Sequence, residues 1–185
     1  SEAVELEAPK HLKDGVITFE DVHFSYGPDK KIIDGISLIA HPGTVTAFVG
    51  PSGGGKTTIF SLIERFYEPD SGTILFNESP ITDLSLNAWR SKIGYVSQES
   101  PLMSGTILSN ITYGMSTIPS MDTVIGAAAA ANAADFIDNL PEKYDTLVGE
   151  RGIKLSCCQR QRIAIARALF HNPKILLLDE ATSNL

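Results

Sequence analysis

Residues 50–57 read Gly50-Pro51-Ser52-Gly53-Gly54-Gly55-Lys56-Thr57, and this stretch decides the fold. It matches G-x-x-x-x-G-K-[ST] at every fixed position, a motif that joins a strand to a helix and holds phosphate. An apolar, β-branched run over 44–49 precedes it, and apolar residues at helical spacing follow it from Thr57 to Phe66. Glycine backbone N–H groups and the helix N-terminus attract anions, Lys56 adds a positive charge, and the Thr57 hydroxyl can ligate Mg²⁺.

A second motif lies near the end of the sequence. The apolar run 175–178 is typical of a buried parallel strand, and Asp179 and Glu180 follow it directly. Open α/β sheets place their ligands at the carboxyl ends of such strands. We expect Asp179 to hold Mg²⁺ through water, and Glu180 to act as the general base for a water that attacks a γ-phosphate.

The remaining pattern surrounds these motifs with short strands and helices. Strands are predicted over 16–26, 32–39, 73–76 and 93–96. Helices are predicted over 86–92, over 159–170 and within the alanine-rich block between residues 98 and 152. The order predicts an α/β fold with a P-loop core, in which a mainly parallel sheet with flanking helices and an N-terminal antiparallel β region carries an inserted α-helical subdomain.

Composition narrows the class of protein. With 15 Lys+Arg against 22 Asp+Glu the net charge is −7, which argues against binding nucleic acid through phosphate neutralisation. Hydrophobic residues make up 43% of the 185, as in an ordinary folded domain. No stretch approaches the roughly 18 apolar residues of a membrane helix, so any work at a membrane requires another segment to hold the chain there.

The segment Leu155-Ser156-Cys157-Cys158-Gln159 makes a family resemblance specific. It occupies the place of the Leu-Ser-Gly-Gly-Gln signature of ATP-binding cassette (ABC) proteins, and the order of the surrounding motifs matches that family. From Val16 onward the chain resembles most of the nucleotide-binding domain of a multidrug or lipid exporter. The resemblance divides it into a linker leading into the fold at 1–14, a P-loop ATPase core at 15–97 and 166–185, and a helical subdomain with the signature at 98–165.

Other segments resemble further family motifs. Tyr26 resembles the aromatic residue that stacks on adenine, and Gln98 resembles the loop glutamine that meets Mg²⁺ and water. Residues 149–152 resemble the loop that touches the coupling helices of the transmembrane domain, and residues 183–185 resemble the start of the D-loop.

The resemblance implies an ATPase that uses ATP and Mg²⁺ and pairs with a second nucleotide-binding domain, most simply an identical chain. The phosphates would be held by Ser52, Gly53, Gly54, Gly55, Lys56, Thr57 and Thr58. Mg²⁺ would be surrounded by Thr57, Gln98 and Asp179, with Glu180 and Gln98 as the catalytic residues. Ser156 and Gln159 would serve the ATP of the opposite copy. Gln98 and Glu150-Arg151 would meet a transmembrane domain, which places the chain at the cytoplasmic face of a membrane.

Two departures from the family keep alternatives open. Cys157 and Cys158 stand where the family has glycines, and two side chains crowd the approach of phosphate, which predicts weakened closure. The signature is therefore engineered, degenerate or misread, or the thiols are redox sensors at a helix N-terminus. The sequence also stops at Leu185, before a histidine that the family uses in hydrolysis. The alternatives are a soluble ABC ATPase of DNA repair or translation, and a module that binds ATP without hydrolysing it.

Overall fold

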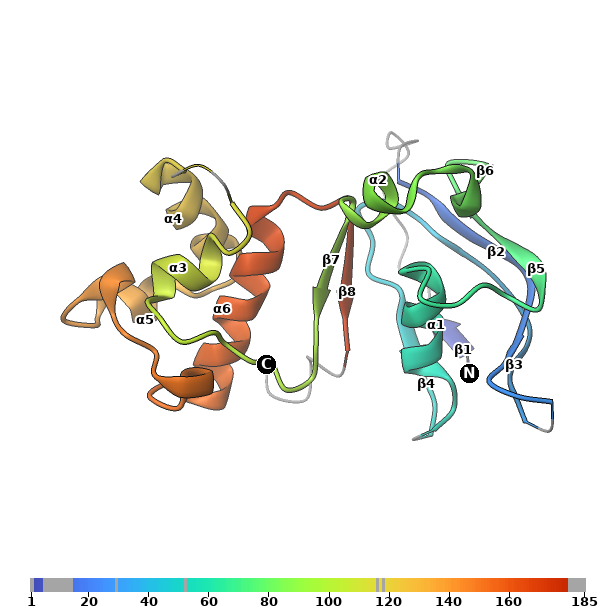
Figure 1. The fold of residues 1–185 in the computed structure, drawn as a ribbon, viewed down its shortest axis with the longest axis horizontal. Helices are drawn as coiled ribbons and strands as arrows, with labels where there is room; N and C mark the ends of the chain where they lie inside the picture. The colour runs from blue at the N-terminus through green and yellow to red at the C-terminus, as the bar shows by residue number, and fades with distance from the viewer. Residues whose placement is uncertain are drawn as a thin grey trace. The chain divides into compact units, whose positions relative to one another are not determined.

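The computed structural model describes residues 2–4, 15–28, 30–51, 53–115, 117 and 119–179. The chain forms two compact units, residues 1–91 and residues 92–185. Figure 1 colours the first unit from blue to green and the second from green to red.

A four-stranded antiparallel sheet in the order β3-β2-β5-β6 organises the first unit. Its strands are β2 (Ile17–Ser25), β3 (Lys31–Ala40), β5 (Ser71–Phe76) and β6 (Ser79–Pro80). The predicted pairing of the first two strands is confirmed, with Ile17 opposite Ala40. In β2 the side chains of Ile17, Phe19, Val22 and Phe24 are buried. Buried residues alternate on each side of a register shift between Phe19 and Val22, which brings Val22 and Phe24 back to the buried face.

The phosphate-loop motif connects a strand outside this sheet to a helix. That strand is β4 (Ala47–Val49), which pairs antiparallel with β1 (Glu2–Val4), and the helix after the loop is α1 (Lys56–Ile63). A short helix, α2 (Leu86–Arg90), closes the end of α1, because Trp89 Nε1 donates to the Ile63 carbonyl at 2.6 Å. The helix that begins at the loop is therefore anchored at its far end by a buried indole.

The second unit combines a parallel strand pair with a helical block. The strands are β7 (Ile93–Val96) and β8 (Ile175–Leu178), with Ile93 opposite Ile175. Both lie at the predicted residues, and among the described residues they are the only parallel pair. The helices are α3 (Ile107–Ile111), α4 (Met121–Ala130), α5 (Ala134–Asp138) and the long α6 (Cys157–Phe170).

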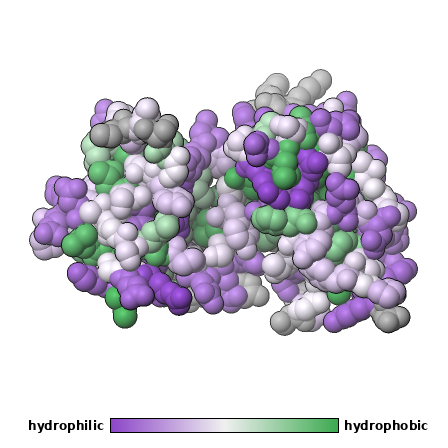
Figure 2. Space-filling model, in the orientation of Figure 1, coloured by the Kyte–Doolittle hydropathy of each residue, from purple (hydrophilic) through white to green (hydrophobic). Residues whose placement is uncertain are grey.

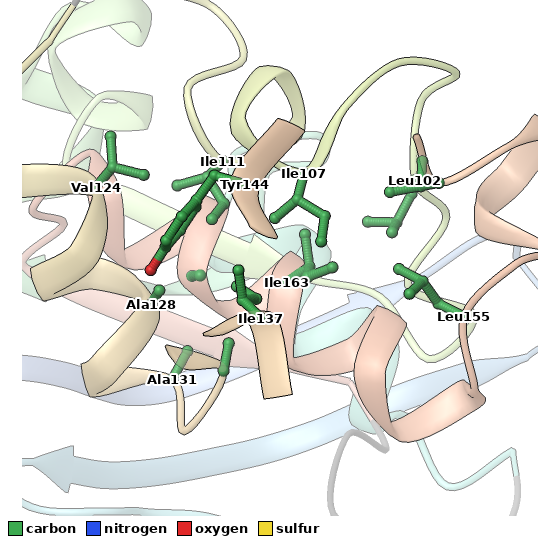
Figure 3. Packing of buried hydrophobic residues seen from close by; sticks show 13 residues of the cluster. Leu102, Ile107, Ile111, Val124, Ala128, Ala131, Ile137, Tyr144, Leu155 and Ile163 are labelled. Atoms are coloured by element: carbon green, nitrogen blue, oxygen red, sulfur yellow. The ribbon is translucent and has the colours of Figure 1, made fainter. Parts of the chain in front are cut away.

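One hydrophobic cluster holds the helical block together. Figure 3 shows Ile163 of α6 among side chains from α3, α4 and α5. The buried members are Leu102, Ile107, Ile111, Val124, Ala128, Ala131, Ala133, Ile137, Tyr144, Val148, Leu155, Ile163 and Ala166. Four of them are alanines, and their small side chains let short helices approach α6 closely.

The surface carries no long apolar stretch on the face shown in Figure 2, where apolar residues form small patches among polar ones. Within the residues described, no helix has both the length and the apolar character needed to cross a membrane. The predicted domain limits at residues 14, 97 and 165 remain predictions.

Candidate functional site

The phosphate-loop motif adopts the backbone conformation that its glycines permit. Gly53 and Gly55 have φ angles of 78° and 86°, in the left-handed region where other residues are strained. The Gly54 N–H donates to the Pro51 carbonyl at 3.0 Å and closes a tight turn. A Cβ added to Gly55 would lie 2.8 Å from Ile33 Cδ1 and 3.2 Å from the Ile32 carbonyl oxygen, so the Ile33 side chain would have to shift to make room.

The N-terminus of α1 opens onto this loop. Its N-cap residue is Gly55, and within the described part of the chain no side-chain cap hydrogen bond is made there. The first N–H groups of a helix lack partners within the helix, so such an end attracts anions when no side chain satisfies them. Lys56 Nζ donates to the carbonyls of Gly50 and Pro51, both at 2.9 Å, which holds the positive charge at the start of the loop. Thr57 is exposed and Thr58 is buried in the same first turn.

Tyr26 lies beside this helix. It follows β2 directly, and its hydroxyl is hydrogen-bonded to the Thr58 hydroxyl at 3.1 Å. The residue is 55% exposed, although its ring packs on Phe24 and Tyr67. The structure thus places an accessible aromatic surface at the helix that carries the phosphate-loop lysine.

The carboxyl ends of β7 and β8 bring two other predicted residues to one edge. Asp179 follows β8, and its backbone N–H donates to the Val96 carbonyl at 3.0 Å. Tyr95 Oη donates to Asp179 Oδ2 at 3.3 Å, which orients this carboxylate. Gln98 lies two residues after β7 and is exposed. Because the strands are parallel, both residues belong to the same sheet edge.

The signature segment forms the start of α6. Ser156 is the N-cap: its Oγ accepts from the Gln159 N–H at 3.2 Å, and its own N–H donates to Gln159 Oε1 at 2.9 Å. This reciprocal pair is a capping box. Cys157 and Cys158 are exposed cysteines in the first turn. The side chains of Ser156 and Gln159 therefore each accept a hydrogen bond from the backbone N–H of the other residue.

The predicted membrane-domain loop lies close in the chain to the signature. Residues Glu150–Gly152 form a 3-10 turn, Glu150 and Arg151 are exposed, and the following Ile153 is 79% exposed. The Val148 N–H donates to the Gly105 carbonyl at 2.9 Å, which joins this loop to the segment after Gln98.

A pocket of about 290 Å³ opens in that same segment of the second unit. It is lined by Tyr95, Val96, Ser97, Ser100, Pro101, Leu102, Met103, Ala164 and Arg167. Arg167 of α6 donates to the Pro101 carbonyl at 2.9 Å, and burial lowers the pKa of its guanidinium. No sequence motif connects Arg167 with this loop, which lies 66 residues earlier in the chain.

The structure thus assembles three groups of predicted residues. Tyr26, Thr58 and the phosphate loop meet in the first unit, whereas Gln98 with Asp179, and Ser156 with Gln159, form two groups in the second. Ser52, Glu180 and the predicted D-loop segment 183–185 lie outside the described residues.

Tyr67 is a candidate that sequence reasoning missed. It contacts Tyr26 with 5.2 Å between ring centroids. The available signal was an aromatic pair, Phe66-Tyr67, directly after the helix of the phosphate loop.

Comparisons with known proteins agree with this geometry. The family described as ABC transporter matches residues 33–183. The multidrug resistance ABC transporter ATP-binding and permease protein of Lactococcus lactis subsp. lactis is 48% identical over 94% of this chain and 30% of its own length. ABC transporter B family member 14 of Arabidopsis thaliana is 52% identical over 92% of this chain and 14% of its own.

A solved structure, described as a bacterial Atm1-family ABC exporter with ATP bound, superposes with a TM-score of 0.85. It is 44% identical and is matched over 97% of this chain and 32% of its own. The chain therefore spans about a third or less of the length of these relatives, and it shares their α/β P-loop fold.

Proposed function

This chain belongs to the ABC transporter family as an ATP-binding domain, and from that premise we propose that it binds and hydrolyses ATP to power export. Pairing of two such domains on ATP would drive the transport step. The observation that carries the proposal is the segment 50–58, in which Gly53 and Gly55 have left-handed φ angles and Lys56, at the start of α1, reaches back to the loop carbonyls.

The loop suits the polyphosphate of ATP. The φ angles of Gly53 and Gly55 turn the backbone as a phosphate cradle requires, and the α1 N-terminus supplies further N–H donors. Lys56 Nζ is bonded to two loop carbonyls and would exchange them for phosphate oxygens. Ser52 and Thr58 would complete the set of phosphate contacts.

Tyr26 suits the base of the nucleotide. Adenine presents a π-face, and stacking of a base on an aromatic side chain stabilises binding by about 1–3 kcal/mol. Tyr26 supplies an exposed ring that is tied through Thr58 to the helix of the phosphate loop.

The proposed Mg²⁺ ligands have suitable chemistry. Thr57, Gln98 and Asp179 offer a hydroxyl, an amide carbonyl and a carboxylate, which are the hard oxygen donors that Mg²⁺ prefers. The ion, when bound, would neutralise charge on the β- and γ-phosphates. The Tyr95 hydroxyl holds the Asp179 carboxylate in place, and Glu180 would take a proton from the attacking water.

The signature and the exposed loop that precedes it suit two different partners. The α6 N-terminus, with Ser156 and Gln159, would face the ATP of a second copy, although the exposed side chains of Cys157 and Cys158 crowd that approach. The exposed Glu150, Arg151 and Ile153 would meet a transmembrane domain together with the Gln98 segment. Such a partner would hold the chain at the cytoplasmic face of a membrane.

Phosphate release tests the hydrolytic role. The chain should release phosphate from Mg·ATP, and Glu180→Gln should stop release while the dissociation constant for ATP stays within about twofold. Release that continues in Glu180→Gln would place the base elsewhere. ATP binding with no release by the parent chain would favour the second candidate, a module that binds ATP without hydrolysing it, which the cysteine pair favours.

A further inference from the structure

Three aromatic rings meet beside the phosphate loop, and the function proposed above uses only one of them. Tyr26 packs nearly at right angles to Phe24, with 4.9 Å between centroids, and to Tyr67, with 5.2 Å. Phe24 and Tyr67 lie 5.4 Å apart. Phe24 is only 5% exposed, whereas Tyr26 and Tyr67 are 55% and 46% exposed. The group therefore has a buried base and two accessible rings.

Tyr26 is held at two places. Its hydroxyl is bonded to the Thr58 hydroxyl at 3.1 Å, and Thr58 is a buried residue in the first turn of α1. Its ring rests on Phe24 and Tyr67 through edge-type contacts, an arrangement that aromatic pairs prefer. Of the two supporting rings, Tyr67 can be replaced with less damage to the core, because Phe24 is buried inside the sheet.

The chain before Tyr67 is itself fixed. The Arg90 guanidinium lies 4.5 Å from the centroid of the Phe66 ring. It also donates to the carbonyls of Glu64 at 3.0 Å and Arg65 at 3.2 Å. These contacts hold the turn that leads out of α1, so Tyr67 rests on a fixed stretch of backbone.

We propose that Tyr67 is a positioning residue for the nucleobase: it holds the Tyr26 ring in the orientation that stacks on the base of a nucleoside triphosphate. The inference rests on the proposed function, in which Tyr26 meets adenine. An exposed ring that rotates freely loses that freedom when a base stacks on it, and a side chain ordered beforehand avoids this cost. Tyr67 would contribute to affinity through Tyr26, and only for ligands that carry a base.

Calorimetric titration measures the affinity of each variant for two ligands, Mg·ATP and inorganic triphosphate, and the comparison tests this role. Both ligands present phosphates to the loop 50–58, but only ATP has a base. Tyr26→Ala should weaken ATP binding by about tenfold, which is the ordinary scale for loss of base stacking. Tyr67→Leu should weaken ATP binding by about three- to fivefold and change triphosphate binding by less than about twofold. Tyr67→Phe, which keeps the ring, should bind ATP like the parent chain.

A double variant separates support from direct contact. In the Tyr26→Ala background, Tyr67→Leu should cause no further loss of ATP affinity, because the ring that it supports is gone. The inference is overturned if Tyr67→Leu leaves ATP affinity unchanged, weakens both ligands equally, or adds its full effect in the double variant. If Tyr26→Ala itself leaves ATP affinity unchanged, base stacking at Tyr26 fails and the inference falls with it. The two failures are therefore distinguishable.

Discussion

Two helices of this chain begin at segments that the sequence assigns to phosphate, and their first turns differ in construction. At α1 the N-cap is a left-handed glycine, which has no side chain of its own to cap the helix, and Lys56 donates hydrogen bonds to loop carbonyls. At α6 a serine and a glutamine cap each other, and two cysteines occupy the first turn. The first end is suited to holding an anion by itself. The second is stabilised by its own side chains, which under the proposed function would have to exchange partners to contact the ATP of a second copy.

Removal of the lysine at the start of α1 should have the largest effect, and it should appear as a loss of affinity for Mg·ATP. Lys56→Ala should weaken Mg·ATP binding by about 100-fold, because hydrogen bonds from a charged group contribute about 1.5–3 kcal/mol. Calorimetric titration measures the loss, with the exposed Lys30→Ala on the same unit as a control that should bind like the parent. An unchanged affinity in Lys56→Ala would remove the phosphate-loop assignment.

Replacement of glycine by alanine should have opposite effects on stability in the phosphate loop and in the interior of α4. Gly55→Ala should lower the free energy of unfolding by about 1–3 kcal/mol, because the residue has φ of 86° and its new Cβ would approach Ile33. Gly126→Ala, inside α4 with no atom within 4 Å of the added Cβ, should raise it by about 0.5–1 kcal/mol. Denaturant unfolding measures both. Equal effects in the two variants would show that the loop conformation does not depend on glycine.

The cap of α6 should matter in two ways. Ser156→Ala removes the capping box and should cost about 1 kcal/mol of stability, as should Ser120→Ala at the N-cap of α4. Only Ser156→Ala should also reduce ATP-dependent dimerisation, since only that serine belongs to the signature. ATP binding to the monomer should be unaffected in both variants. Equal dimerisation in the two would contradict the role given to the signature.

A smaller effect concerns Glu64, the C-cap of α1, whose carboxyl group has a raised pKa because of burial, opposed in part by the charge of Arg90. A carboxyl group with a raised pKa in the folded state stabilises the fold at acidic pH and loses this contribution as pH rises through that pKa. Glu64→Gln should therefore compare more favourably with the parent in thermal unfolding at pH 7 than at pH 4. A difference that does not change with pH would contradict this expectation.

Local motifs were readable from the sequence, and contacts between distant segments were not. The loop 50–57 follows from its own residue types, and β7 and β8 lie at the predicted residues. The apolar helical spacing predicts a face that extends to Phe66, yet α1 ends at Ile63. Its last carbonyls are met by Trp89 and Arg90, which lie 25 or 26 residues further along the chain.

The signature segment and the aromatic group at Tyr26 each hold one feature that the sequence prediction did not include. The sequence predicts α6 from Gln159, whereas the helix begins at Cys157, and the Ser156–Gln159 capping pair was a readable signal for the earlier start. The Phe66-Tyr67 pair signals an aromatic segment, but it does not assign Tyr67 to the site, because the contact with Tyr26 depends on the end of β2 meeting the turn after α1.

The proposed function requires that two chains pair when ATP binds, and the molecular mass in solution reports this pairing. Light scattering in the Glu180→Gln background, with and without Mg·ATP, compares the parent signature with a Cys157→Gly, Cys158→Gly version. If ATP drives pairing, the glycine version should shift from 19.9 kDa to twice that mass when Mg·ATP is added. It should do so at a lower protein concentration than the parent chain requires. A mass that stays monomeric in both chains when ATP is bound would contradict the proposed pairing.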